Sequence, residues 1–409
     1  MSNVDLRERL RRLGIHQGAG QLRSQPRRRG RAIEDLLPGE VVDTGHGPFF
    51  LHRETHQLDD PHGAHSLADL LAHAGRSPAL LAQDERWAEV DFRRAAFLDT
   101  ETTGLAGGTG TYVFLVGVGV FEGDEFTVHQ FFMRDYGEEP ALLLALGEML
   151  DRLDAVVTFN GKGFDLPLLE TRFILARQPP RLVGAPHLDL LPPARRFWKY
   201  RLESCALSSL ETEILGVQRT EADVPGWLIP TLYQDYARSG DASEMPRIFY
   251  HNALDILSLV TLAARMCDLL AAPLPPDGDV PGEDLYGLGR LFHDLGQADR
   301  AEAAFVQAAQ VCRSPAVCEM AMRDLAYLLK REERRHDALP WWQRLVETAG
   351  AVYACEELAK HYEWHDEDLA QAIAWTERGI ALAKAWPPGL KRREALAELE
   401  HRLERLQRK

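Results

Sequence analysis

Two carboxylates stand near the end of an apolar stretch, "FLDTETTGL", that begins at residue 97. Asp99 and Glu101 are two residues apart, and on a strand such residues point to the same face. Two like charges this close persist where a cation neutralises them or where one is protonated. The pair therefore predicts a divalent-metal site, although many such pairs are simply exposed to solvent.

A second acidic residue follows in "AVVTFNGKGFDLPLL", which starts at residue 155. The pattern predicts a strand, a glycine-broken turn and a helix with Pro167 in its first turn. Asp165 lies at the entry to this helix, where it could cap the helix, bind a metal, or do both. His187 and Asp189 end another predicted strand, and we interpret them as a hydrogen-bonded structural pair rather than as ligands.

The third motif is "FYHNALDILSLVTLAARM", whose apolar spacing predicts a helix. His251 and Asp255 are four residues apart, so they share one face of that helix. Such a pair alone is more often a surface pair. The set as a whole, D-x-E, a distant Asp at a strand-to-helix turn and H-x-x-x-D, favours a catalytic site.

A basic and aromatic segment, "PPARRFWKYRLES", starts at residue 192. Its mixture of charged and aromatic side chains is typical of contacts with phosphates and unpaired bases. It also fits an amphipathic helix with Phe197 and Trp198 in the core, which is the interpretation we favour for these two aromatic residues.

The elements that carry these motifs belong to a predicted α/β domain with strands at 95–100, 111–121, 126–133 and 155–160, of which the first three form a meander. Beyond a Pro/Gly-rich linker the chain becomes helical and self-similar. The predicted segments are a basic N-terminal arm and irregular lead-in (1–90), the α/β domain (91–272), the linker (273–284), helical repeats (285–384) and a capping helix (385–409).

The helical repeats are predicted from small residues at similar offsets. Ala301, Ala338 and Ala372 are 37 and 34 residues apart, close to the tetratricopeptide period. Small residues at such positions let paired helices approach each other. We therefore expect about three tetratricopeptide-like units, which would present a surface for a protein partner.

The net charge, the cysteine content and the absence of long apolar stretches limit the classes of protein to which the chain can belong. The net charge of −15 argues against a protein that coats nucleic acid through a basic surface, although the first 31 residues are rich in arginine. The five cysteines form no C-x-x-C pair, and we expect them to be reduced. No signal peptide or membrane-spanning stretch is recognised, so a cytoplasmic protein with no membrane partner is expected.

Together, "FLDTETTGL", "TFNGKGFDLPLL" and "YHNALDILSL" resemble the motifs of the DEDD exonucleases of the ribonuclease H-like superfamily. The chain is most similar to the YprB-like subfamily of predicted exonucleases, in which this domain precedes tetratricopeptide repeats. The resemblance implies a mixed sheet flanked by helices, a 3′-5′ exonuclease activity on DNA or RNA, and two divalent metal ions, Mg²⁺ or Mn²⁺, bound by Asp99, Glu101, Asp165 and Asp255.

The general base departs from the family pattern. His251 stands four residues before Asp255 and Tyr250 stands five before it, whereas the family's histidine usually stands five before and its tyrosine four. We favour His251, because it shares the face of Asp255 and because histidine as a residue type, unlike tyrosine, can act as a base near neutral pH, but the choice between the two stays open.

Hydrolysis of phosphodiesters builds negative charge on the attacking and leaving oxygens, which two cations about 4 Å apart can neutralise. Carboxylate ligands suit Mg²⁺ or Mn²⁺ better than zinc. The alternative is a non-catalytic nucleic-acid clamp that recruits a partner through its repeats. Substrate contacts, to single-stranded 3′ ends, are expected from Thr102, Gly104, Asn160, Lys162, Arg195, Arg196, Lys199 and Arg201.

Overall fold

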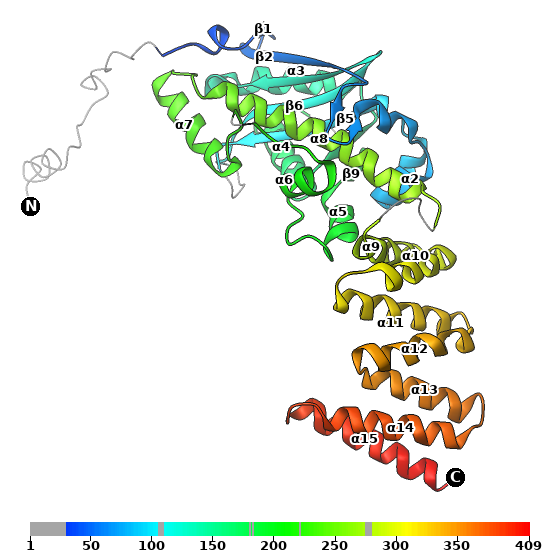
Figure 1. Ribbon diagram of the computed structural model, residues 1–409. Coiled ribbons are helices and arrows are strands. Elements are labelled where there is room, and N and C mark those ends of the chain that lie inside the picture. Colours follow the sequence, from blue (N-terminus) through cyan, green and yellow to red (C-terminus); the bar gives the residue numbers. More distant parts are fainter. Residues whose placement is uncertain (1–29, 105–109, 180, 182–183, 221, 275–279) are drawn as a thin grey trace, which may run out of the picture.

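A computed structural model describes residues 30–104, 110–179, 181, 184–220, 222–274 and 280–409. An α/β domain occupies the first part, and an array of helices extends from it (Figure 1). The expected class, an α/β domain followed by an all-helical region, is confirmed. Most of the basic N-terminal arm lies outside the described residues, as do residues 105–109, which follow the motif that contains Asp99 and Glu101.

A mixed seven-stranded sheet, in the order β1-β2-β7-β6-β5-β8-β9, forms the centre of the α/β domain. β5, β6 and β7 form the predicted antiparallel meander, while β8 and β9 run parallel to β5. The strands are β1 (Glu40–Asp43), β2 (Pro48–Gln57), β5 (Ala95–Thr102), β6 (Val113–Glu122), β7 (Glu125–Phe132), β8 (Ala155–Thr158) and β9 (His187–Asp189), with a separate pair β3 (Pro61–His62) and β4 (His65–Ser66).

The predicted lead-in is part of this sheet. β2 pairs with β7 from Phe50, opposite Phe132, to Gln57, opposite Glu125. Phe49 and Phe50 are fully buried, so the sheet needs this strand to complete its core. The short apolar runs before residue 91 were compatible with an irregular or a β-rich segment, and part of this segment forms β1 and β2.

Helices cover both faces of the sheet. Alternation along β5 directs Phe97 and Asp99 to the face covered by α8, and Ala96 and Leu98 to the face covered by α3 and α4. The helices of this domain are α2 (Arg76–Ala82), α3 (Glu139–Leu150), α4 (Asp165–Leu175), α5 (Leu191–Trp198), α6 (Leu207–Leu210), α7 (Ile229–Ser239) and α8 (Met245–Ala271), with a short 3₁₀ helix, η8, at Gly226–Leu228.

α8 approaches the sheet unusually closely at β6. A Cβ atom at Gly117 would lie 2.2 Å from the side-chain oxygen of Asn252, and one at Gly119 would lie 2.5 Å from Ile256. Because these two positions have no side chains, the backbone of α8 lies close to β6. The side chains of α8 can therefore reach β5, the strand next to β6.

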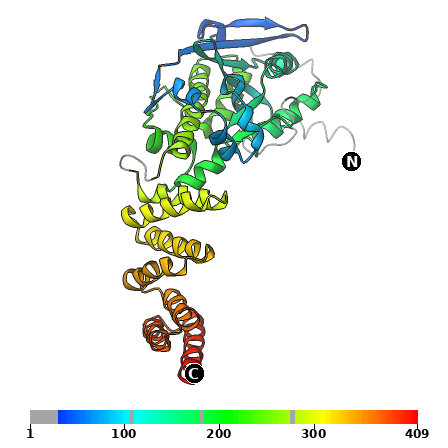
Figure 2. The ribbon, with the colours of Figure 1, turned by 90° about the vertical axis from the view of Figure 1, so that its right-hand side faces the viewer.

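The helical array consists of antiparallel pairs that stack below the α/β domain (Figure 2). The small residues expected at the helix contacts, Ala301, Ala338 and Ala372, are all buried. Within the described residues, no helix has the length and apolar character needed to cross a bilayer. The helices are α9 (Gly282–Asp294), α10 (Ala298–Val311), α11 (Pro315–Arg331), α12 (Arg335–Ala349), α13 (Val352–Trp364), α14 (Leu369–Lys384) and α15 (Leu390–Gln407).

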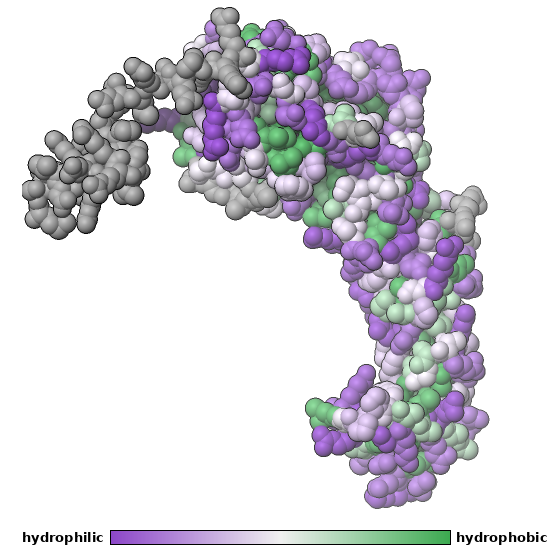
Figure 3. All heavy atoms as spheres, turned by 60° about the vertical axis from the view of Figure 1, so that its left-hand side comes forward, coloured by the Kyte–Doolittle hydropathy of each residue, from purple (hydrophilic) through white to green (hydrophobic). Residues whose placement is uncertain are grey.

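The array joins the α/β domain through α9 and α5. Arg201 forms a bidentate ion pair with Asp284, at 2.7 and 2.9 Å, and the rings of Tyr200 and Tyr286 pack edge to face. A Cβ atom at Gly287 would lie 2.4 Å from the carbonyl oxygen of Phe197. The junction is therefore closely packed, and the molecule has a hooked outline with a hollow beside the array (Figure 3).

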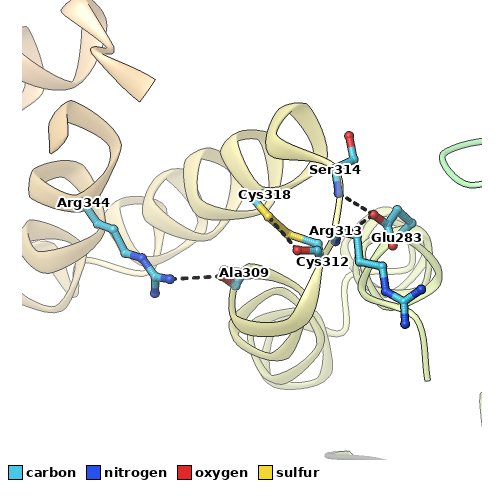
Figure 4. Close-up of a disulfide and its surroundings, with 7 residues drawn as sticks. All are labelled: Glu283, Ala309, Cys312, Arg313, Ser314, Cys318 and Arg344. Atoms are coloured by element: carbon cyan, nitrogen blue, oxygen red, sulfur yellow. Dashed lines mark hydrogen bonds between the residues drawn. A yellow bond between two sulfur atoms is a disulfide. The ribbon is translucent and has the colours of Figure 1, made fainter. Parts of the chain in front are cut away.

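One cysteine expectation was wrong, because Cys312 and Cys318 form a disulfide (Figure 4). Cys312 follows the last residue of α10 and Cys318 lies in the first turn of α11, so the tight connection brings their Cα atoms to 5.7 Å. The carboxylate of Glu283 accepts hydrogen bonds from the backbone of Arg313 and Ser314 at the same connection. The spacing gave no C-x-x-C signal.

Candidate active site

Asp99 and Glu101 lie near the end of β5, on the face that α8 covers. The side-chain amide of Asn252, on α8, donates to the Asp99 carboxylate at 2.8 Å. Gln130 of β7 donates in turn to the Asn252 oxygen, also at 2.8 Å, and both amides are fully buried. This chain of amides fixes the orientation of Asp99. Glu101 makes no hydrogen bond to any described residue.

Asp165 reaches the same region from the first residue of α4. The N-cap of the helix is Phe164, so the capping role that the sequence allowed for Asp165 is not the one observed. Its carboxylate instead accepts a hydrogen bond from the Thr100 hydroxyl, on β5 between the other two acids. Asp165 is 6% exposed, and burial raises its pKa to about 6.

His251 and Asp255 lie on α8 as predicted, with the Nε2 atom of His251 3.6 Å from a carboxylate oxygen of Asp255. The Nδ1 atom of His251 is 2.8 Å from the Asp223 carboxylate. An ionised carboxylate can only accept, so the contact with Asp223 favours the tautomer with its proton on Nδ1, whereas a guanidinium nitrogen of Arg219, a donor 3.0 Å from the same atom, favours the other tautomer. Tyr250 accepts a hydrogen bond from Thr220 at 3.1 Å.

Arg219 is a residue that the sequence reasoning missed. Its guanidinium bonds Asp255 and also pairs with Glu211 at 2.7 Å and Asp223 at 3.5 Å. A second nitrogen of this group lies 3.0 Å from Nδ1 of His251. The arginine therefore supplies positive charge next to Asp255. It was not predicted from the sequence because it lies 36 residues before Asp255 in the chain.

Negative charge accumulates where these acids meet. The pKa of Asp99 is raised well above its usual range, first by burial and then by Asp255 and Asp165. The pKa of Glu101 is raised in the same way, by burial and then by Asp99, Asp255 and Asp165. Repulsion of this kind is relieved by protonation or by a bound cation.

A cleft of about 740 Å³ opens at these acids. Asp99 and Asp255 lie on its wall together with Asn160, Arg195 and Lys199. The two basic residues come from α5, whose aromatic residues Phe197 and Trp198 are buried as we favoured. The cleft thus combines acidic groups with two cations along one edge.

Other predicted substrate residues lie elsewhere. Arg201 is engaged with α9, and Arg196 donates to Gln83 at 3.1 Å, so neither lines the cleft. Thr102 is buried and its hydroxyl donates to the carbonyl of Gly104 at 2.8 Å. These two residues shape the turn after β5.

The loop between β8 and α4 is held by Asp189. Its carboxylate accepts from the backbone N–H groups of Asn160 at 2.7 Å and Lys162 at 3.1 Å, while the Lys162 side chain is exposed. His187 contacts the Thr158 hydroxyl at 2.8 Å. The structure agrees with the interpretation of Asp189 as a hydrogen-bonded structural residue.

Trp227 was not singled out from the sequence. It is 71% exposed, although tryptophan is usually buried. Its neighbour in η8, Gly226, lies against His251: a Cβ atom there would be 3.7 Å from Nε2. A lone Trp between a proline-glycine turn and a helix carries no periodic signal, so only the fold places its neighbour, Gly226, beside His251.

The comparison with known proteins agrees with this geometry. Residues 96–267 match the family model described as the RNase_H superfamily, and this range contains all four acids and His251. The chain is 33% identical over 273 residues to the "Uncharacterized protein YprB" of Bacillus subtilis (strain 168), which covers 65% of this chain and 64% of that protein. The chain thus spans somewhat less than two thirds of that relative's length. The α/β domain, with its acids on β5, α4 and α8, therefore belongs to the RNase_H superfamily.

Proposed function

We propose that this protein is a metal-dependent exonuclease that hydrolyses the phosphodiester bonds of DNA or RNA from the 3′ end. The observation that carries the proposal is the convergence of Asp99, Glu101, Asp165 and Asp255 from three distant motifs, with Asp99 and Asp255 on the wall of a cleft that also presents basic side chains. The membership of the RNase_H superfamily supports a nucleic-acid hydrolase, and the polarity rests on the resemblance to DEDD exonucleases.

The acid cluster fits two divalent cations, Mg²⁺ or Mn²⁺. The donors are carboxylate oxygens, which such hard cations prefer, and the raised pKa values of Asp99 and Glu101 indicate charge that the protein itself neutralises only in part. When bound, such ions lower the pKa of water and stabilise the charge on the attacked phosphate. Ribonuclease H-like nucleases generally use divalent metals.

His251 is proposed as the general base. In the tautomer that Asp223 favours, Nε2 is free to accept a proton from water on the side of Asp255. Arg219 positions the same group, because it contacts both Asp255 and the imidazole. Base and orienting carboxylate are thus arranged as in other hydrolases that use histidine.

Substrate binding is proposed along the basic edge of the cleft. Arg195 and Lys199 contact backbone phosphates, and Asn160 lines the opposite wall. Trp227 is exposed and follows Gly226, which lies next to His251, and we propose that it stacks on a base near the 3′ end, a contact that every base can make. A protein partner for the helical array and a cytoplasmic location are part of the same proposal.

The test is hydrolysis of single-stranded DNA and RNA carrying a label at either end, with Mg²⁺, Mn²⁺ or EDTA. We expect that, with metal present, the 3′-labelled substrate releases labelled mononucleotides from the start of the reaction. The 5′-labelled substrate should give a ladder of labelled fragments that become shorter with time. The Asp99→Asn variant is expected to lose this activity and to keep nucleic-acid binding, since the basic edge is unchanged.

Asp154→Asn is the matched control. This carboxylate lies at the opposite end of the sheet, where Arg94 pairs with it, so the same change of charge should leave turnover unaltered. Products of internal cleavage would show an endonuclease activity and contradict the proposed exonuclease activity. Binding without cleavage of any substrate would favour the non-catalytic clamp.

A further inference from the structure

Three potential metal ligands meet in the helical array, far along the chain from the acidic site. His336 is the second residue of α12, His361 lies in the last turn of α13, and Asp366 follows in the turn before α14. α12 and α13 pack as antiparallel neighbours, so the start of one lies beside the end of the other. The backbone N–H groups of His365 and Asp366 both donate to the carbonyl of His361, which fixes the turn.

The donor atoms of the cluster have the spacing of a coordination shell. Nε2 of His361 lies 3.2 Å from the Oδ1 atom of Asp366, and Nε2 of His336 lies 3.7 Å from the same oxygen. All three donor atoms are within 4.8 Å of one another. A tetrahedral ion with bonds of about 2.0 to 2.1 Å holds its ligands about 3.3 Å apart, so small side-chain rotations suffice.

His361 gives the second, independent observation. Its side chain is only 6% exposed, and its Nε2 atom is buried without a hydrogen-bond partner, because the nearby Asp366 oxygen is poorly aligned for one. A buried polar atom left without a partner destabilises a protein by about 1 to 3 kcal/mol. A bound ion at this position would satisfy it.

We propose that His336, His361 and Asp366 bind a transition-metal ion such as Zn²⁺, with water in the fourth position. Two imidazoles and one carboxylate suit this class of ion, whereas the all-carboxylate set of the cleft suits Mg²⁺ or Mn²⁺. The ion ties the start of α12 to the turn between α13 and α14. It therefore links two consecutive helical pairs.

Access and charge at the site are compatible with a cation. A cavity of about 220 Å³ opens beside His361, lined also by His365 and Trp364. The two lysines of this cavity, Lys330 and Lys360, are both paired with Glu357. The positive charge that an entering ion meets is thus already neutralised in part.

The test is metal binding by the full chain without an affinity tag, stripped with EDTA and then held in excess Mg²⁺ so that the carboxylate cleft is saturated. Calorimetry with Zn²⁺ and absorption spectroscopy with Co²⁺ are the two probes. We expect one tight Zn²⁺ site per chain and the intense visible bands of tetrahedral Co²⁺. His336→Ala and Asp366→Asn should each weaken binding by about 100-fold or more.

His401→Ala is the matched control, because it removes an exposed histidine from α15 of the same array. His336 is itself 75% exposed in its side chain, so its replacement should leave the fold intact. Zn²⁺ should raise the melting temperature of the wild type and of His401→Ala, and not that of His336→Ala. Equal affinities in His336→Ala and His401→Ala, or no tight binding in excess Mg²⁺, would overturn the proposal. Neither readout depends on nuclease activity.

Discussion

At the scale of single residues, the position of the proton on His251 decides its role. The Asp223 carboxylate lies 2.8 Å from Nδ1, and Nε2 faces Asp255. The neighbouring Tyr250, the other candidate base, is hydrogen-bonded to Thr220. The geometry therefore favours the histidine, in agreement with the argument from helical spacing.

We expect His251→Ala to lower turnover by about 10² to 10⁴, since general bases contribute by this amount, with metal binding retained. Tyr250→Phe, which removes only the hydroxyl that meets Thr220, should change turnover little. Steady-state kinetics with Mn²⁺, together with calorimetric titration of the metal, measures both effects. A comparable loss in Tyr250→Phe alone would move the role of base to the tyrosine.

A second residue-scale prediction concerns the stability of the metal-free protein. The pKa of Asp165 rises from 3.8 to about 6 on folding, so between these values the folded state holds a proton that the unfolded state has lost. The free energy of unfolding therefore falls as pH rises through this window, by about 3 kcal/mol when complete. In EDTA, Asp165→Asn should melt at a higher temperature than the wild type at about pH 7.5.

Calorimetric scans at about pH 5 and about pH 7.5 test this sign. The advantage of Asp165→Asn should shrink at the lower pH, where the wild-type carboxyl is itself protonated. Adding Mn²⁺ at the higher pH should stabilise the wild type more than the variant. A variant that melts below the wild type at both pH values in EDTA would contradict the argument.

At the scale of elements, α5 serves two surfaces. Arg195 and Lys199 line the cleft, while the backbone of Phe197 receives α9 through the close contact at Gly287. A displacement of α9 therefore displaces the basic edge of the cleft. The helical array and the substrate site share this one short helix.

We expect Gly287→Ala to raise KM by about tenfold, which corresponds to about 1.4 kcal/mol of lost phosphate contact, with a smaller change in kcat. The added Cβ would lie 2.4 Å from the Phe197 carbonyl oxygen, so α9 or α5 must move, whereas the acids lie on other elements. Gly389→Ala is the control, because a Cβ there meets no atom within 4 Å. An unchanged KM with intact folding would show that α5 holds its position without α9.

The sequence predicted most elements of the core because their signals are local. The apolar runs of β5, β6 and β7, the strand-turn-helix at Asp165 and the period of α8 are each local signals, and the longest, α8, covers 27 residues. The pairing of β2 was not predicted because its partner strand is β7, 68 to 82 residues later, and the pairing appears only in the sheet. Arg219 and the His336 cluster escaped for the same reason, since residues distant in sequence form them.

At the scale of the whole molecule, the array extends the α/β domain into a hook (Figure 3). The disulfide closes the connection between α10 and α11, and the proposed metal ion would tie α12 to the turn that follows α13. Helical arrays are held together by contacts between neighbouring units only. Local cross-links of this kind, a disulfide and a metal ion, therefore make the helical array stiffer along its length.

The order of the acids along the chain has a consequence for biosynthesis. Asp99 and Glu101 lie on β5, but Asp255 lies on α8, the last helix of the α/β domain. Domains fold as the ribosome releases them, at about 5 to 20 residues per second, from the N-terminal side. A nascent chain therefore lacks the complete acidic set until α8 has emerged, and a chain that ends earlier cannot assemble the cluster.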